Sequence, residues 1–191
     1  AEVISKILYP ADDHMDGKIL RIKQQYFFVS ASLQTIVSKH FKKYSTLDNL
    51  ADKVSVHIND THPALCVPEL MRILMDEYGY GWDDAWEICQ KTLSYTNHTV
   101  MSEALERWDE GLFSSVVPEL TGIIYRINDR LNDELRAAGT DEETRSRMQI
   151  IDTGVIHMAR LAVYVSSAVN GVAKIHTEIL KNDLSYAVHS A

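Results

Sequence analysis

The chain has 191 residues, of which 46% are apolar and 24% are charged, and its formal net charge at pH 7 is −8. This composition is typical of a globular protein and excludes a disordered chain. Because 27 acidic residues outnumber 19 basic ones, a nucleic-acid partner, which needs a basic surface, is disfavoured. No apolar run approaches the roughly 20 residues that cross a bilayer, so no membrane partner is expected. Cys66 and Cys89 lie in apolar helical patterns and predict buried thiols in a reducing, cytoplasmic compartment.

In chain order, the first predicted elements are a long helix and a strand. Residues 17–41 place apolar side chains, Phe27 among them, at helical spacing, which predicts a long and well-buried helix. A polar link separates this helix from residues 54–58, where apolar and polar side chains alternate. The alternation predicts a strand whose apolar side chains, Val56 and Ile58 included, share one face.

Helical patterns dominate the rest of the sequence. Pro68 and Glu69 are predicted as the first positions of a helix that ends at Gly79, since proline is tolerated in a first turn and glycine commonly follows a last one. Thr140 is predicted to cap the start of a later helix. The other expected helices cover residues 81–94, 118–139 and 150–180, the last broken at Asn170-Gly171, with a short β-prone stretch at residues 94–100.

These patterns describe a mostly helical segment with a few short strands, each followed by a helix. Such an order favours the α/β class with parallel strands. In parallel sheets, ligands gather at the carboxyl ends of the strands. The residues that follow the predicted strands are therefore the first candidates for a functional site.

Four hydrogen-bonding residues, Asn59, Asp60, Thr61 and His62, follow the first predicted strand. One interpretation is structural: Asp60 or Thr61 accepts hydrogen bonds from free backbone N–H groups at a helix start, and His62 packs under the turn. The other interpretation is functional: a carboxylate and an imidazole face a cleft together, where they hydrogen-bond a polyhydroxylated ligand or position water. The residues themselves leave both interpretations open.

Asn97 and His98 form a second polar corner, after the second strand pattern. A single histidine there is more often structural than catalytic, but two parallel strands would bring both corners to one edge of a sheet. A metal site is a further alternative, because His57, Asp60 and His62 are closely spaced. Pleating, however, puts His57 on the face opposite to Asp60, and the spacing matches no tight zinc motif. We therefore expect no metal.

The chain resembles the α-glucan (glycogen, starch and maltodextrin) phosphorylases along nearly its whole length, in a form that looks bacterial. The resemblance lies in the stretches "LYPADDHMDGKILRIKQQYFFVSASLQ", "INDTHPALCVPELMRIL", "WDDAWEICQKTLSYTNHTVMSEALERW" and "AVNGVAKIHTEILK". It implies a GT-B architecture, in which two Rossmann-like domains enclose the active site. Residues 1–191 would be a single segment, the latter part of the N-terminal domain, and the parent chain would extend on both sides.

The reaction that the resemblance implies is reversible phosphorolysis. Inorganic phosphate removes the non-reducing terminal glucose from an α-1,4-glucan, with retention, as glucose 1-phosphate. The implied cofactor is pyridoxal phosphate, whose phosphate group relays a proton to the substrate phosphate. The implied parent enzyme is a homodimer.

The resemblance also assigns roles to residues of the two corners. His98 and Asp60 match catalytic positions, and His98 is expected to hydrogen-bond the terminal glucosyl unit near its 6-hydroxyl. The backbone carbonyl of His98 matches a position beside the oxocarbenium-like centre of the sugar, where positive charge would develop during the reaction. His62 and Asn97 are expected to contact the sugar as well. Asp13, where animal enzymes have Asn, matches a glucose-contacting position in a gate loop over the active site.

The chain departs from the family pattern at several positions. Ser167 stands where a family histidine is usual, and Arg160 stands where His or Asn is common. Ser38 and Lys39 replace the paired arginines that hold a nucleotide phosphate in regulated animal enzymes, so no AMP-type activation is expected. The cofactor lysine belongs to the C-terminal domain of the family, so this segment supplies no cofactor-binding residue. Residues 1–191 alone are therefore expected to be inactive.

Two other function classes remain as alternatives. The first is a non-catalytic helical module that serves folding or carbohydrate binding, and the second is a metal-dependent hydrolase. A parent gene that extends in frame and supplies a cofactor lysine would favour the phosphorylase, whereas a gene ending at these boundaries would favour the module. Stoichiometric metal, or His57 placed beside Asp60 and His62, would favour the hydrolase.

Overall fold

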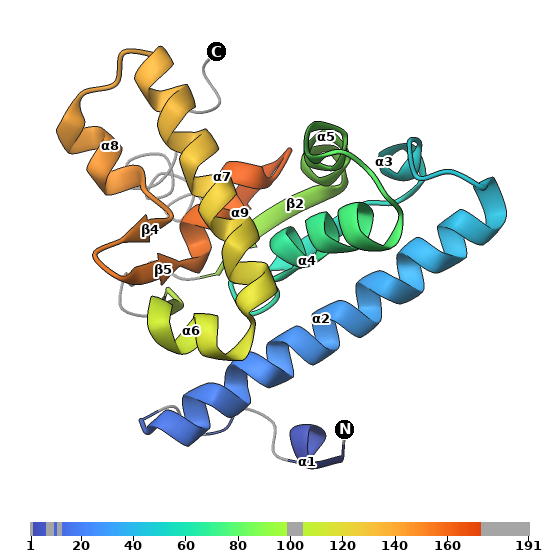
Figure 1. Cartoon of the computed structure of the whole chain (residues 1–191), viewed down its shortest axis with the longest axis horizontal. Helices are drawn as coiled ribbons and strands as arrows, with labels where there is room; N and C mark the ends of the chain where they lie inside the picture. Colours follow the sequence, from blue (N-terminus) through green and yellow to red (C-terminus); the bar gives the residue numbers. More distant parts are fainter. Residues whose placement is uncertain (1, 7–9, 11–12, 99–104, 173–191) are drawn as a thin grey trace.

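The computed structural model describes residues 2–6, 10, 13–98 and 105–172 of the chain. Helices surround two small sheets, and α2 runs along one side of the molecule (Figure 1). The expected α/β class, mostly helical with a few short strands, is confirmed. Within the described ranges, no helix has both the length and the apolar character needed to cross a membrane.

The elements are α1 (Glu2–Ser5), α2 (Met15–Tyr44), α3 (Leu50–Lys53), β1 (Val56–Asn59), α4 (Cys66–Arg72), the π-helix η1 (Ile73–Glu77), α5 (Trp82–Thr92), β2 (Leu93–Asn97), β3 (Arg107–Asp109), α6 (Glu110–Val116), α7 (Pro118–Ala137), α8 (Glu142–Met148), β4 (Ile151–Asp152), β5 (Val155–His157), α9 (Met158–Val165) and β6 (Val169–Gly171).

Helix α2 is amphipathic, and its buried stripe follows a regular spacing. Ile22, Val29, Leu33 and Val37 are buried, and intervals of seven and four residues return to the same face of a helix. The prediction of a long helix is therefore confirmed. The expectation that Phe27 belongs to its buried face is wrong, because Phe27 is 38% exposed. It lies two residues from Val29, and that offset turns it away from the buried stripe.

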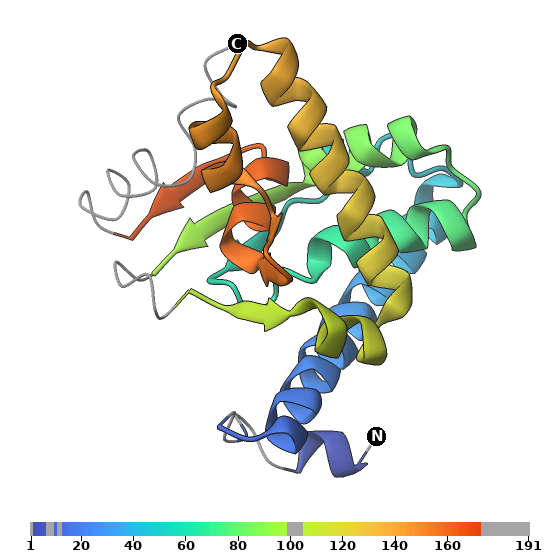
Figure 2. The same ribbon diagram turned by 60° about the vertical axis from the view of Figure 1, so that its left-hand side comes forward.

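A three-stranded parallel sheet has the strand order β1-β2-β6, and β2 and β6 run side by side in Figure 2. Asn59 lies opposite Thr96, so β1 and β2 end at nearly the same level. Ile58 and Tyr95 are fully buried on one face, whereas His57 on the other face is exposed. The predicted parallel pairing and the predicted alternation in the first strand are both confirmed.

The region predicted as one broken helix, residues 150–180, begins instead with an antiparallel hairpin. Strands β4 and β5 pair through a turn with Gly154 at a φ of 77°, and β3 completes the sheet order β3-β5-β4. Helix α9 follows, but Asn170 and Gly171 lie in strand β6 rather than at a helix break. Residues 173–180 lie outside the described residues. The prediction was wrong because short apolar runs do not distinguish a buried strand from a buried helix.

Two predicted helix starts move in the structure. Helix α4 begins at Cys66, two residues before Pro68, which still lies in the first turn, where its missing N–H is tolerated. The helical segment runs on through η1, and Gly79 follows it at a φ of 75°, as predicted. Asp141, rather than Thr140, caps α8, because its carboxylate accepts a backbone hydrogen bond of 2.9 Å from the third residue of that helix.

The other predicted elements agree with the structure to within a few residues. The helices expected over residues 81–94 and 118–139 are α5 and α7, and Gly139 has a φ of 73° just after α7 ends. Strand β2 accounts for the start of the β-prone stretch at residues 94–100. Residues 99–100 lie outside the described part of the chain.

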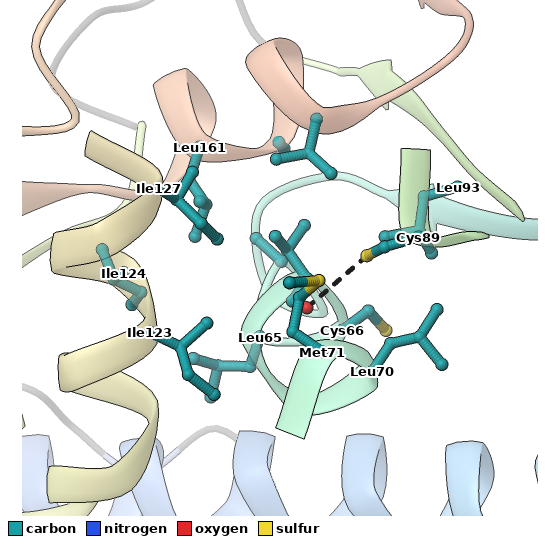
Figure 3. Packing of buried hydrophobic residues seen from close by; sticks show 14 of the residues in the cluster. Leu65, Cys66, Leu70, Met71, Cys89, Leu93, Ile123, Ile124, Ile127 and Leu161 are labelled. Carbon is teal, nitrogen blue, oxygen red and sulfur yellow. Dashed lines mark hydrogen bonds between the residues drawn. The ribbon is translucent and has the colours of Figure 1, made fainter. Parts of the chain in front are cut away.

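The main core lies between α4, α7 and the start of β2. Leu70 and Met71 of α4 lie across from Ile124 and Ile127 of α7, with Leu93 of β2 on the far side of α4 (Figure 3). Each of these side chains is at most 1% exposed. Burying a side chain of this size contributes about 1.5–3 kcal/mol, so the helices hold the sheet in place mainly through apolar contact.

Both cysteines are free thiols inside this core, as predicted. The thiol of Cys89 donates to the carbonyl oxygen of Val67 at 3.7 Å, the dashed line in Figure 3. Burial raises the pKa of Cys66 to about 12, and burial likewise raises the pKa of Cys89. Neither sulfur is therefore a thiolate nucleophile at neutral pH.

Replacing Ile124 with alanine tests the core. The substitution removes buried methyl groups and leaves a cavity, so it should lower the free energy of unfolding by about 2–5 kcal/mol. Urea unfolding measures the change. The neighbouring Tyr125, which is 41% exposed, supplies the control, and Tyr125→Ala is expected to stay within about 0.5 kcal/mol of the wild type. Equal effects of the two substitutions would contradict the assigned core.

Candidate functional site

The two polar corners meet at one edge of the parallel sheet. Asn59 ends β1 opposite Thr96 of β2, and the backbone N–H of Asp60 donates to the carbonyl of Thr96 at 3.0 Å. Asn97, the last residue of β2, pairs in turn with Gly171 at the end of β6. Because all three strands are parallel, their carboxyl ends lie together. The expectation that the sheet brings both corners to one edge is confirmed.

Asp60 forms the first corner through a strained turn. Its φ of 67° lies in the left-handed region that residues other than glycine rarely adopt. One carboxylate oxygen, Oδ1, accepts from the backbone N–H of Thr61 at 2.6 Å and from its hydroxyl at 3.3 Å. These bonds hold the turn at Asp60, but they do not cap a helix as predicted, because α4 begins at Cys66 and its N-cap residue Leu65 makes no side-chain hydrogen bond. Backbone strain of this kind is characteristic of binding sites and turns.

Tyr95 lies beneath this corner and was not among the predicted site residues. Its side chain is fully buried, and its hydroxyl has no hydrogen-bond partner among the described residues. Burial raises the pKa of Tyr95, and the carboxylate of Asp60 raises it further. The hydroxyl is therefore a neutral donor beside Asp60. The sequence pattern showed only a strand residue pointing to the core.

His98 forms the second corner and contacts the first. Its Nε2 lies 2.5 Å from Oδ1 of Asn59, and the imidazole is exposed. Asn97, expected to contact a sugar, is only 1% exposed, so its side chain belongs to the wall of the corner. Asp13, expected in a gate loop, is highly exposed, just before the start of α2.

His62 faces a cavity of about 410 Å³ between α2, the first corner and β3. It also borders a second, more apolar hollow of about 350 Å³ beside Phe28 and Pro63. The parallel pairing brings the two corners together at backbone level, and neither Asp60 nor His98 is among the described residues that line the larger cavity. The larger cavity is lined by Lys18, Arg21, Thr61, His62, Leu105, Glu106, Arg107, Trp108, Asp109 and Leu112.

A buried carboxylate holds the wall of this cavity together. Oε1 of Glu106 accepts from Nε of Arg21 at 3.1 Å and from Nε2 of Gln25 at 2.8 Å, and the side chain of Glu106 is 8% exposed. Its backbone carbonyl accepts from the N–H of Met158 at 3.2 Å. Glu106 therefore connects α2, β3 and α9. Oε2 of Glu106 and Nε1 of Trp108 are buried without hydrogen-bond partners among the residues described.

Glu106 and Trp108 were missed as site residues. Both belong to the stretch "EALERW", which supported the family resemblance but carries no motif that indicates a cavity. The signal lies in tertiary structure, because Arg21 and Glu106 are 85 residues apart in sequence.

His57 takes part in a hydrogen-bond chain across the sheet. The hydroxyl of Thr96 donates to Oδ1 of Asn170 at 2.6 Å, so it accepts from Nε2 of His57, also at 2.6 Å. Nδ1 of His57 then accepts from the hydroxyl of Ser94 at 2.9 Å. The imidazole of His57 is therefore directed toward the neighbouring strand β2. In the described part of the chain, no group of three or more His, Cys, Asp or Glu side chains could hold a metal ion.

Two of the departures from the family pattern, Ser167 and Arg160, make hydrogen bonds that link elements of the fold. The hydroxyl of Ser167 donates to the carbonyl of Leu93 at 2.8 Å, where β2 begins. Nη1 of Arg160 donates to the carbonyl of Gln149 at 2.7 Å, which ties α9 to the end of α8. Both side chains therefore support the elements that frame the sheet.

The chain is similar in sequence to known proteins. It matches the carbohydrate phosphorylase family over residues 1–190. Glycogen phosphorylase of Bacillus subtilis (strain 168) is 52% identical over 181 residues, which is 94% of this chain and 23% of that protein. Glycogen phosphorylase of Pasteurella multocida (strain Pm70) is 46% identical, with 93% of this chain and 22% of that protein covered. The brain form of human glycogen phosphorylase is 48% identical over 197 residues, with 96% and 23% covered.

The fold and the site define an α/β segment whose parallel strands end in polar corners beside a mixed-charge cavity. The family match extends over nearly the whole segment, so the chain belongs to the carbohydrate phosphorylases. It spans about a quarter of the length of the curated relatives that it matches.

Replacing Glu106 with alanine tests the wall of the cavity. The guanidinium of Arg21 would lose a charged partner in a largely desolvated position, so the free energy of unfolding should fall by roughly 1.5–3 kcal/mol. Urea unfolding provides the measurement. The control is Glu87→Ala, which breaks an exposed ion pair with Lys91 and should have a much smaller effect. Similar losses in both variants would contradict a special role for Glu106.

His157 makes this region sensitive to acid. Burial, then the guanidiniums of Arg160 and Arg107, lower the pKa of His157 to about 4, while Asp152 opposes the shift. Between its ordinary pKa of about 6.5 and pH 4, the unfolded chain binds a proton that the folded chain does not. Stability should therefore fall as the pH falls through this window. His157→Gln should lose less stability between pH 7 and pH 5 in urea unfolding, and an unchanged loss would refute the assignment.

Proposed function

We propose that the chain is part of an enzyme that phosphorolyses α-1,4-glucans and releases glucose 1-phosphate. The observation that carries the proposal is the edge of the parallel sheet, where the corners of Asp60 and His98 meet beside the cavity of His62. The names of the relatives support the same activity. Carbohydrate sites use many oriented hydrogen-bond donors and acceptors rather than a high net charge. This edge of the sheet offers both donors and acceptors.

Each corner residue has a proposed role toward the terminal glucosyl unit. His98, the exposed imidazole, binds a sugar hydroxyl, and the dipole of its carbonyl faces the positive charge that develops as the glycosidic bond breaks. The carboxylate of Asp60 adds negative potential at the same edge. His62 and Asp13 extend the binding surface, with Asp13 contributed by a gate that precedes α2, and the buried Asn97 backs the sugar site from the end of β2.

Pyridoxal phosphate is the proposed cofactor, and it supplies proton transfer through its phosphate group when bound. The residues described here do not fit its covalent attachment. Lys18 is the one lysine among the described residues that line the larger cavity, and it is exposed. An imine-forming lysine requires a desolvated amine. We therefore assign the attachment to another part of the longer protein.

The wider setting of the segment is also proposed. Residues 1–191 form the latter part of the N-terminal domain of a GT-B enzyme, which acts in the cytoplasm as a homodimer on glucan and inorganic phosphate. The exposed rings of Phe27 and Phe28 on α2 are consistent with contacts to other parts of such an enzyme. Light scattering of the full-length protein tests the dimer.

The activity is tested by measuring glucose 1-phosphate released from a linear α-1,4-glucan and phosphate. The full-length protein carrying this chain should form it, and His98→Ala should lower kcat/KM by about 10²-fold, because an oriented group at the developing charge is lost. Lys39→Ala, at an exposed position on α2, is the matched control and should leave the rate unchanged. No product from the wild type would refute the proposed function.

The isolated segment gives a further expectation. Residues 1–191 alone should release no glucose 1-phosphate in the same assay, even when pyridoxal phosphate is added, because the proposed attachment lysine lies elsewhere. Measurable product from the segment would overturn the assignment of the cofactor to the rest of the enzyme.

A further inference from the structure

One hydrogen bond crosses directly between the two corners. Oδ1 of Asn59, the last residue of β1, lies 2.5 Å from Nε2 of His98, which follows the last residue of β2. Asn59 lies opposite Thr96 in register, and side chains alternate between faces along a strand. His98, two residues after Thr96, therefore continues the face that carries Asn59.

The backbone beneath this contact is well held. The N–H of Asp60 donates to the carbonyl of Thr96 at 3.0 Å, so the chain stays paired one residue beyond β1. On the same face, the hydroxyl of Thr96 is engaged by both His57 and Asn170 at 2.6 Å. Asn59 therefore presents its amide to His98 from a paired strand end.

This hydrogen bond determines which nitrogen of His98 carries the proton. An amide oxygen only accepts hydrogen bonds, so Nε2 of His98 must be the donor. In a neutral imidazole the other nitrogen, Nδ1, then has a free lone pair and acts as an acceptor. An acceptor at this position suits a hydroxyl group, which can donate. It does not suit a phosphate dianion, which has no proton to offer.

We propose that Asn59 is a positioning residue that holds His98 as the Nε2–H tautomer, so that Nδ1 accepts a hydrogen bond from a sugar hydroxyl. The part that concerns the sugar rests on the proposed function, whereas the tautomer does not. Asn59 thereby contributes to selecting a neutral polyhydroxylated ligand over an anion at this corner.

The neutral amide is essential to this role. Aspartate at position 59 would offer an oxygen at the same distance, but its negative charge would favour the doubly protonated imidazolium. An imidazolium has two donors and no acceptor, so it could no longer accept from a hydroxyl. Asn59→Asp therefore separates the tautomer role from a simple bracing role, because it preserves shape and the hydrogen bond but changes the protonation of His98.

The tautomer is tested by nitrogen-15 NMR of ring-labelled histidine in the full-length protein, without any glucan. The His98 signals are assigned by their loss in His98→Gln. The wild type should show a protonated Nε2 and an unprotonated Nδ1, and Asn59→Leu should shift His98 toward a mixture of tautomers. The matched control is Asn170→Leu, which removes the amide that accepts from Thr96 and should leave the His98 tautomer unchanged. A protonated Nδ1 in the wild type, or no change in Asn59→Leu, would overturn the proposal.

Kinetics with α-1,4-glucan and phosphate test the consequence for the ligand. Asn59→Leu and Asn59→Asp should each lower kcat/KM by about tenfold. In a His98→Gln background, Asn59→Leu should have no further effect, because Asn59 acts through His98. An additive loss, or unchanged kcat/KM in a variant whose tautomer has shifted, would overturn the role in sugar binding. Wild-type protein that shows the expected tautomer but forms no glucose 1-phosphate would refute the proposed function and leave the tautomer assignment standing.

Discussion

The parallel pairing of β1 and β2 is the constraint on which the candidate site depends. The two strands are separated by residues 60–92, which are mostly helical, yet their register places Asn59 opposite Thr96. Everything at the site follows from this register: the turn at Asp60, the contact of His98 with Asn59, and the chain through His57. A slip of one residue would send each side chain to the other face of the sheet. Ile58 and Tyr95, which pair in this register and are fully buried on the opposite face, oppose such a slip because it would bring them out of the core.

Much of the fold could be predicted from local pattern, because the signals were local. Pro118 at the start of α7 and Gly139 after its end are cues that act within one helical turn, and α7 agrees closely with its prediction. The β4–β5 hairpin was missed because its strands are only two and three residues long, too short to show a period of two. Phe27 was misplaced because apolar character alone does not say which side of a helix is buried.

The candidate site, like the fold, was predicted in part from the sequence and in part was not. The order of strand and helix predicted that the corners of Asp60 and His98 would share an edge, and that prediction depends only on topology. The pairing of Arg21 with Glu106 and the cavity that they border depend on how α2 crosses β3, which no short-range pattern encodes. The roles of Asp13, Asp60, His62, Asn97 and His98 toward a sugar remain proposals. His57 shows the limit of spacing arguments, since its hydrogen bonds point along the sheet rather than toward Asp60.

The position of Glu106 has a consequence for how relatives of this chain diverge. One carboxylate oxygen receives both Arg21 and Gln25, which lie one helical turn apart on α2. Loss of the acid alone would remove a charged partner from the guanidinium of Arg21, so a lineage that changes position 106 should also change position 21. We expect the two positions to exchange together across homologous sequences, as a charged pair in some lineages and an uncharged pair in others, while exposed pairs such as Glu87 and Lys91 drift independently.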